Sequence, residues 1–113
     1  MVFLCYGTRP EIIKMAPVAR ALDELAVPYR TVFTGQHPDL YRDVADLMPA
    51  PHFKLAPADR EATMSAVFAH ILLGLEQVFL SEKPRLVVAQ GDTNTVLAAA
   101  MAAHHQGAAF GHI

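Results

Sequence analysis

Short apolar runs alternate with longer segments of helical periodicity along this chain, and that alternation constrains the fold more than any other feature. Continuous apolar runs occupy residues 2–6, 29–34, 85–90 and 108–113. Runs that are apolar throughout are typical of parallel strands covered on both faces. A further brief extended piece is predicted around residues 52–55. The sequence therefore predicts four strands and a short fifth.

Helical segments are predicted between these runs, at residues 11–25, 38–47, 64–79 and 94–105. The third is the clearest, because its apolar residues keep the i, i+3, i+4 spacing of one helix face throughout. The fourth is rich in alanine, which allows close packing on a sheet. Pro10 suits a first helical turn and Pro84 ends the third helix, whereas Pro17 is expected to kink the first.

The order of these elements defines the fold class. Strands separated by helices of this length pair in parallel through right-handed crossovers. We therefore predict an α/β fold, a Rossmann-like parallel sheet with helices on both faces. The chain has 113 residues, 53% of them apolar, and no linker segment, so it has room for one domain with a substantial core.

Charge and apolar patterning argue against two classes of partner. Nine Lys and Arg against eleven Asp and Glu give a net charge of −2 and no basic stripe, so nucleic acid is not expected as a partner. No uninterrupted apolar stretch approaches the ~18–20 residues of a membrane span, so no membrane is expected either. The single cysteine, Cys5, lies in an apolar run and suits a reducing compartment. A cytoplasmic location is predicted.

Ligands of open parallel sheets bind beyond the carboxyl ends of the strands, which selects residues 7–11, 34–38 and 91–95. The first loop offers Thr8 and Arg9, with Lys14 one helical turn further on. Arg9 and the free N–H groups of a helix start suit an anion, although a solvated arginine explains the same residue equally well. Only Gly7 stands where a dinucleotide fingerprint needs three glycines, and no P-loop pattern occurs. NAD and ATP are therefore disfavoured, and no cofactor is predicted.

The other two loops carry Gln36 and His37, and Asp92 and Thr93. His37 suits a substrate contact or a general acid, but such a residue more commonly caps the following helix. Asp92 stands where an acid or base would lie in the predicted cleft, while the local sequence slightly favours a helix N-cap. No histidine or cysteine pair has metal-ligand spacing, so no metal site is predicted.

Four segments together resemble one enzyme family. They are Gly7-Thr8-Arg9-Pro10-Glu11 with Lys14-Met15-Ala16-Pro17, Thr34-Gly35-Gln36-His37, Gly91-Asp92-Thr93 with the alanine-rich helix after it, and Phe110-Gly111-His112-Ile113. In this order and spacing they resemble the non-hydrolysing UDP-N-acetylglucosamine 2-epimerases across the whole chain. The related hydrolysing enzymes typically have Gly-Ser-Arg-Ala at the first loop and Gly-Asp-Arg at the third.

The resemblance implies reversible interconversion of UDP-GlcNAc and UDP-ManNAc, by elimination of UDP to 2-acetamidoglucal and re-addition, in cell-surface polysaccharide biosynthesis. Such chemistry needs acid–base groups near sugar carbon 2 and cations for the departing diphosphate. By position, Asp92 and Lys14 would be catalytic. Substrate would be bound by Thr8, Arg9, Gln36, His37, Thr93 and His112.

The resemblance also implies an architecture larger than this chain. Residues 1–113 would form an incomplete N-terminal Rossmann-like domain of a two-domain GT-B-like enzyme, without its C-terminal UDP-binding domain and without the glutamate that follows the family's Gly-His-Ile segment. The full-length enzyme is expected to be a homodimer, and the 113-residue chain alone is expected to be inactive. Pro38-Asp39 stands where the family often has Arg-Glu or Arg-Gln, which disfavours activation by a second substrate molecule.

Two other functions remain open from the sequence. One is a GT-B-type glycosyltransferase, an enzyme of similar architecture that would pass the sugar to an acceptor. The other is a non-catalytic binding module derived from an epimerase.

Overall fold

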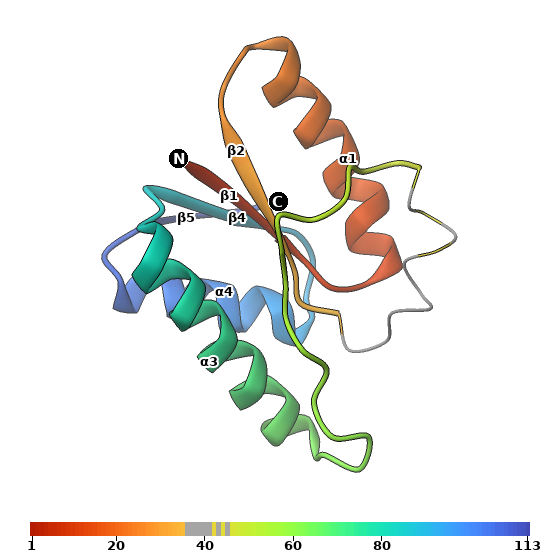
Figure 1. Ribbon diagram of the computed structural model, residues 1–113, viewed down its shortest axis with the longest axis vertical. Helices are drawn as coiled ribbons and strands as arrows, with labels where there is room; N and C mark the ends of the chain where they lie inside the picture. The colour runs from red at the N-terminus through yellow and green to blue at the C-terminus, as the bar shows by residue number, and fades with distance from the viewer. Residues whose placement is uncertain (36–41, 43, 45) are drawn as a thin grey trace.

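Five parallel strands form one sheet in the described part of the chain, which comprises residues 1–35, 42, 44 and 46–113 of the computed structural model (Figure 1). Their order across the sheet is β3-β2-β1-β4-β5. The elements are β1 (Val2–Tyr6), α1 (Arg9–Glu24), β2 (Tyr29–Phe33), β3 (Phe53–Lys54), α3 (Met64–Glu82), β4 (Leu86–Ala89), α4 (Asn94–His105) and β5 (Ala109–His112).

The architecture confirms the predicted fold class. All neighbouring strands pair in parallel, and the brief extended piece is present as β3. α1 covers one face of the sheet, and α3 and α4 cover the other (Figure 1). The helix predicted at residues 38–47 lies mostly outside the described residues.

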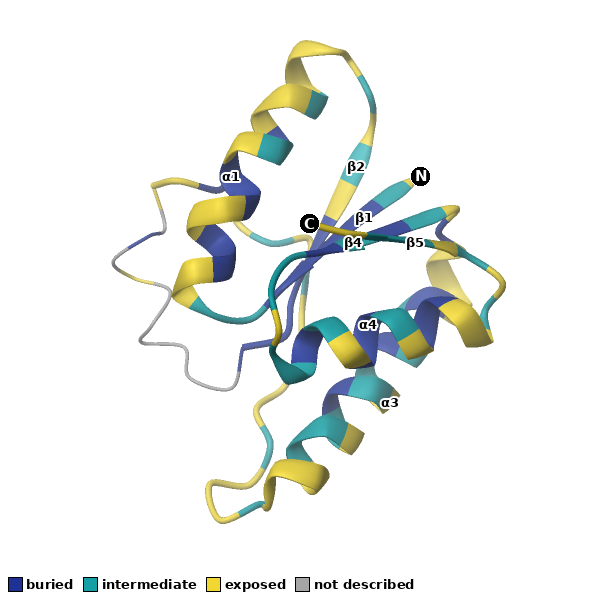
Figure 2. Cartoon of the chain, turned by 180° about the vertical axis from the view of Figure 1, so that it is seen from behind, coloured by how far each residue is buried: buried dark blue, intermediate teal, exposed yellow. Residues whose placement is uncertain are grey.

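β1 is the central strand and is buried on both faces (Figure 2). Successive side chains of a strand point to opposite faces, so β1 contributes to two cores. Phe3 and Cys5 pack beneath α3 and α4, whereas Leu4 and Tyr6 pack beneath α1. A central strand that is covered on both faces therefore requires a continuous apolar run. The same burial raises the pKa of the Cys5 thiol far above its ordinary value.

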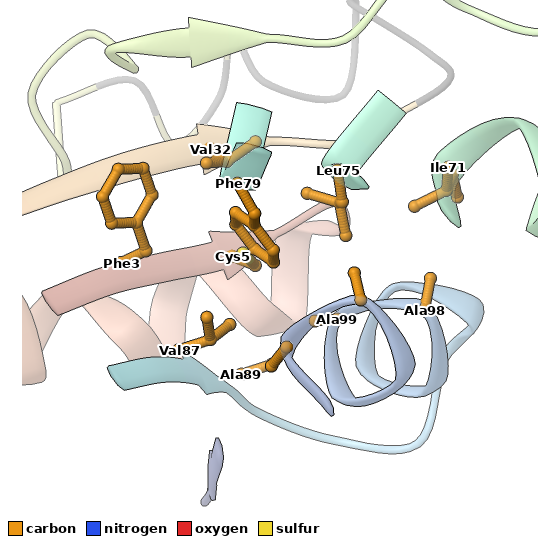
Figure 3. Packing of buried hydrophobic residues seen from close by; sticks show 12 residues of the cluster. Phe3, Cys5, Val32, Ile71, Leu75, Phe79, Val87, Ala89, Ala98 and Ala99 are labelled. Atoms are coloured by element: carbon orange, nitrogen blue, oxygen red, sulfur yellow. The ribbon is translucent and has the colours of Figure 1, made fainter. Parts of the chain in front are cut away.

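α3 and α4 pack against each other as well as against the sheet. Figure 3 shows Ala99 of α4 pointing toward Leu75 of α3, both without exposed surface. The small alanine side chain lets the two helices approach closely. α3 also contacts the sheet, where the ring of Phe79 packs edge-on against that of Phe3 of β1, with ring centroids 6.0 Å apart.

α3 is also the one helix among the described residues that is long and apolar enough to cross a membrane by length and composition, with a mean hydropathy of 1.5. Besides the apolar face that packs on the core, this helix carries leucines on its exposed side. Leu75 and Phe79 are buried in the core, while Leu73 and Leu80 are exposed. The absence of a membrane partner stays a prediction.

α1 begins two residues earlier than predicted and ends one residue earlier, at Glu24. Thr8 is the N-cap, and its hydroxyl oxygen accepts from the Glu11 backbone N–H at 3.4 Å. Pro10 lies in the first turn, where no helical hydrogen bond is lost. Pro17, which was expected to kink the helix, is exposed and lies within one continuous helix that extends to Glu24.

Phe79→Ala is expected to lower the free energy of unfolding by about 3–5 kcal/mol, the usual cost of removing a fully buried aromatic ring. Leu80, the next residue of the same helix, is 55% exposed. Leu80→Ala is therefore the matched control, with an expected change within about 0.5 kcal/mol. Urea denaturation followed by circular dichroism measures both, and equal losses would contradict the described packing.

Candidate active-site cleft

A cleft of about 790 Å³ opens at the carboxyl ends of the strands. β1 lies between β2 and β4, so the chain direction across the sheet reverses between β1 and β4, the position where open α/β sheets bind ligands. The volume suits a ligand of several hundred daltons. The lining comes from the loops after β1, β2, β3 and β4 and from the start of α3: Gly7, Thr8, Thr34, Gly35, Pro57, Ala58, Asp59, Arg60, Ala62, Met64, Val67, Ile71, Asp92, Thr93, Asn94 and Thr95.

The loops are brought together by close contact at Gly7. A Cβ atom on this residue would lie 2.3 Å from the Thr34 hydroxyl oxygen and 2.7 Å from that of Thr95. Both hydroxyls are buried and lie 2.6 Å apart in a hydrogen bond. Glycine is therefore required at position 7, because any side chain would displace the pair that joins the β2 loop to α4.

A buried carboxylate joins the β1 loop to the β4 loop. Glu11, in the first turn of α1, is 2% exposed. The Thr8 hydroxyl donates to its Oε2 at 3.1 Å. The Thr93 hydroxyl donates to Oε1 at 3.0 Å and to Oε2 at 3.2 Å. The backbone of Gly7 also favours the charged form of this carboxyl group.

The pKa of Glu11 is raised above its ordinary value. Desolvation is the largest cause, because burial disfavours the charged form. The hydrogen bonds from Thr93, Thr8 and Gly7 oppose it, and the negative charge of Asp92 adds to it. The exposed carboxylate of Asp92 thus acts on the buried carboxyl of Glu11 at this edge of the sheet.

Asp92 is exposed and lines the cleft, on the turn between β4 and α4. The structure corrects the N-cap interpretation, because Thr93 is the N-cap residue of α4. Thr93 makes no side-chain cap hydrogen bond, and its hydroxyl donates to Glu11. Asp92 therefore precedes the cap and is an exposed residue of the cleft lining.

The other predicted site residues are distributed unevenly. Thr8 lines the cleft beside Thr93, whereas the exposed Arg9 and Lys14 on α1 are not among the described lining residues. The His112 Nε2–H donates to the Gly91 carbonyl at 2.6 Å, next to Asp92 rather than in the cleft lining. Gln36 and His37 lie outside the described residues. Among the described residues, no three His, Cys, Asp or Glu side chains are placed to hold a metal ion.

Three features of the cleft were missed in the sequence. Glu11 was read only as the start of a helix, although an acidic residue three positions after a threonine N-cap is a known pairing. The buried Thr34–Thr95 pair joins residues far apart in sequence, so no local signal marks it. Arg60 lines the cleft from the loop after β3. Ligands bind beyond the carboxyl ends of parallel strands, so applying this rule to the short predicted strand as well as to the longer ones would have selected that loop.

The fold and cleft define a class of protein: a Rossmann-like α/β domain with a polar cleft at the switch point of a parallel sheet. Within that class, the chain belongs to the UDP-N-acetylglucosamine 2-epimerase family, whose profile matches residues 20–113. The resemblance stated from the motifs is thereby confirmed.

Individual relatives agree with this assignment. The UDP-N-acetylglucosamine 2-epimerase of Methanocaldococcus jannaschii is 39% identical over 104 residues, which covers 86% of this chain and 27% of that protein. The Bacillus subtilis enzyme of the same name is 35% identical over 115 residues, covering 99% of this chain and 30% of the relative. The chain thus spans about 30% of the length of the relatives it matches.

Solved structures of such enzymes superpose on most of the chain. The Neisseria meningitidis UDP-GlcNAc 2-epimerase bound to UDP-GlcNAc has a TM-score of 0.90 at 32% identity, covering 99% of this chain and 31% of that one. The M. jannaschii enzyme in complex with UDP-GlcNAc and UDP has a TM-score of 0.87 at 34% identity, covering 99% and 32%.

The pH dependence of stability should report the burial of Glu11. Because its folded-state pKa is raised from 4.5, its contribution to the free energy of unfolding is fully present below the unfolded pKa and is lost as pH rises through the folded pKa. Glu11→Gln does not titrate at this position, so the variant is expected not to lose this part of its free energy of unfolding as pH rises. Urea denaturation in steps from about pH 4 to about pH 7 measures the difference between parent and variant.

Glu24→Gln is the matched control, because Glu24 is an exposed residue at the end of the same helix. This variant should lose stability with rising pH as the parent does. If parent and Glu11→Gln change in parallel across this range, the carboxylate is not desolvated as described.

Proposed function

We propose that this chain supplies the N-terminal part of the active site of an enzyme that interconverts UDP-GlcNAc and UDP-ManNAc. The observation that carries the proposal is the exposed carboxylate of Asp92, on a cleft at the β1–β4 switch point in a chain of this family. Support for the ligand comes from the two solved relatives, whose structures contain UDP-GlcNAc.

The proposed reaction proceeds in two balanced steps. A base removes the proton from sugar carbon 2, the C1–O bond to UDP breaks, and a C1=C2 double bond forms in 2-acetamidoglucal. UDP oxygen then bonds to C1 again while an acid delivers a proton to C2 from the opposite face. Asp92 is one of these acid–base groups, and an acid or base in reach of the proton typically contributes 10²–10⁴-fold.

The remaining predicted residues take supporting roles in this proposal. Lys14, assigned to the catalytic machinery, and Arg9 balance the charge that develops on the diphosphate. Thr8 and Thr93 shape the cleft wall, and Gln36, His37 and His112 contribute to substrate binding. The chain then forms the first part of a two-domain, GT-B-like enzyme in the cytoplasm, which serves cell-surface polysaccharide synthesis and whose second domain binds most of the UDP.

A chimera tests the proposal. Residues 1–113 replace the matched N-terminal segment of the M. jannaschii epimerase, with the junction after β5 taken from the superposed structure. In heavy water the chimera is expected to incorporate deuterium at C2 of UDP-GlcNAc and to form UDP-ManNAc. Asp92→Asn should lower that rate by about 100-fold or more, because the amide neither accepts nor donates the proton.

Asp46→Asn, at an exposed residue outside the cleft lining, is the control and should leave the rate unchanged. The 113-residue chain alone is expected to show no exchange. A folded chimera that incorporates no deuterium at C2 would favour the non-catalytic binding module. Transfer of labelled sugar to an acceptor would favour a glycosyltransferase.

We infer that the complete enzyme is a homodimer, and the exposed apolar residues Leu73 and Leu80 of α3 and Leu97 of α4 support a second copy as their cover. Light scattering of the chimera is expected to give twice the protomer mass. Leu73→Glu with Leu80→Glu should shift it to the monomer, and a monomeric parent would contradict the inference.

A further inference from the structure

Among the described residues, Glu11 is the single carboxylate buried in the fold. Burying a charge is unfavourable unless it is hydrogen-bonded, and here both oxygens are used. Thr8 and Thr93 donate hydroxyl hydrogens from two different loops. Glu11 is 2% exposed and is not among the residues that line the cleft, so its role is in the protein's own geometry.

The turn that carries Asp92 is held from two sides. On the α1 side, the residue after Asp92 donates to Glu11 at 3.0 Å. On the β5 side, the residue before it, Gly91, accepts from His112 at 2.6 Å, and its N–H donates to the Ile113 carbonyl at 3.3 Å. Asp92 itself is exposed between these two anchored neighbours.

The alternative is that Glu11 only caps α1. A cap would accept from the backbone N–H groups of its own helix start. The longest-range contact of Glu11 is instead to Thr93, 82 residues away. Its two hydroxyl donors, Thr8 and Thr93, are the N-cap residues of α1 and α4, so one carboxylate links the position of the β4–α4 turn to that of the β1–α1 turn.

We propose that Glu11 is a positioning residue, whose carboxylate fixes Thr93 and thereby the adjacent Asp92 against the start of α1. This proposal rests on the proposed function, in which Asp92 is an acid–base group. Loss of the contact leaves Asp92 present and exposed but mobile relative to the sugar. A misplacement of about 1 Å is enough to lower a rate by about 10²-fold.

The kinetic test uses the chimera described above. Glu11→Gln and Thr93→Val are each expected to lower kcat by about 10- to 100-fold while KM changes by less than about threefold, since the defect lies in the reacting geometry rather than in binding. Thr93→Ser keeps the donor hydroxyl and should restore kcat to within about threefold of the parent. The double variant should be no slower than the slower single variant, because both changes break one contact.

Two controls separate positioning from general loss of stability. Glu24→Gln changes an exposed carboxylate on the same helix, and Val87→Ala creates a cavity in the core beneath α4. Neither should alter kcat, although Val87→Ala lowers the melting temperature. If Val87→Ala reduces kcat as much as Glu11→Gln does, Glu11 is a stabilising residue only and the proposal is overturned.

A measurement on the 113-residue chain keeps the positioning role testable even if the chimera is inactive. Amide hydrogen exchange at residues 91–94 is expected to accelerate by about tenfold in Glu11→Gln and Thr93→Val, and to stay at the parent rate in Thr93→Ser and Glu24→Gln. An unchanged rate of amide exchange in Glu11→Gln would overturn the positioning proposal. If the chimera is inactive but amide exchange accelerates in the 113-residue variants, the proposed function is overturned and the positioning of the turn stays supported.

Discussion

The burial of β1 on both faces is the constraint on which the rest of the structure depends. β1 pairs in parallel with β2 and with β4, and its side chains enter a core on each side of the sheet. Parallel pairing places the carboxyl ends of β1, β2 and β4 at one edge, and right-handed crossovers put α1 on one face and α3 and α4 on the other. The cleft follows from that topology, because the β1 and β4 loops diverge to opposite faces at the point where they emerge from the sheet.

Polar side chains from several loops pack closely at the cleft edge. Gly7 leaves room for the Thr34–Thr95 hydroxyl pair, and no larger residue would. Glu11 accepts hydrogen bonds from two loops, and these bonds offset part of the cost of its burial, which is the main cause of its raised pKa. These contacts are the kind that determine local geometry more than overall stability: each is short, directional and satisfied at both ends.

The sequence predicted the layers of this fold well, because each layer has a periodic signal. The continuous apolar run of β1 and the helix face that includes Leu75 and Phe79 could be recognised directly, and their pairing followed from rules of connection. Asp92 was found through its place after a strand. The contacts of Glu11 could not be found in the same way, because they depend on a residue 82 positions away. The N-cap of α4 lies one residue later than predicted, at Thr93 rather than Asp92, because both residue types favour this position and capping propensity does not choose between neighbours.

Asp92 is exposed although the turn that carries it is anchored. The turn that carries it is fixed from within, by contacts to α1 and to β5, but the carboxylate faces water, and so do Arg9 and Lys14 on α1. Charged groups act more strongly on a substrate when water is excluded, because the local dielectric falls. If Asp92 has the proposed acid–base role, the group is in place and the site still needs a cover that excludes water. Under the proposed function, that cover belongs to the part of the family's length that this chain does not span, which is why the placement of Asp92 is expected to be measurable in 113 residues and turnover is not.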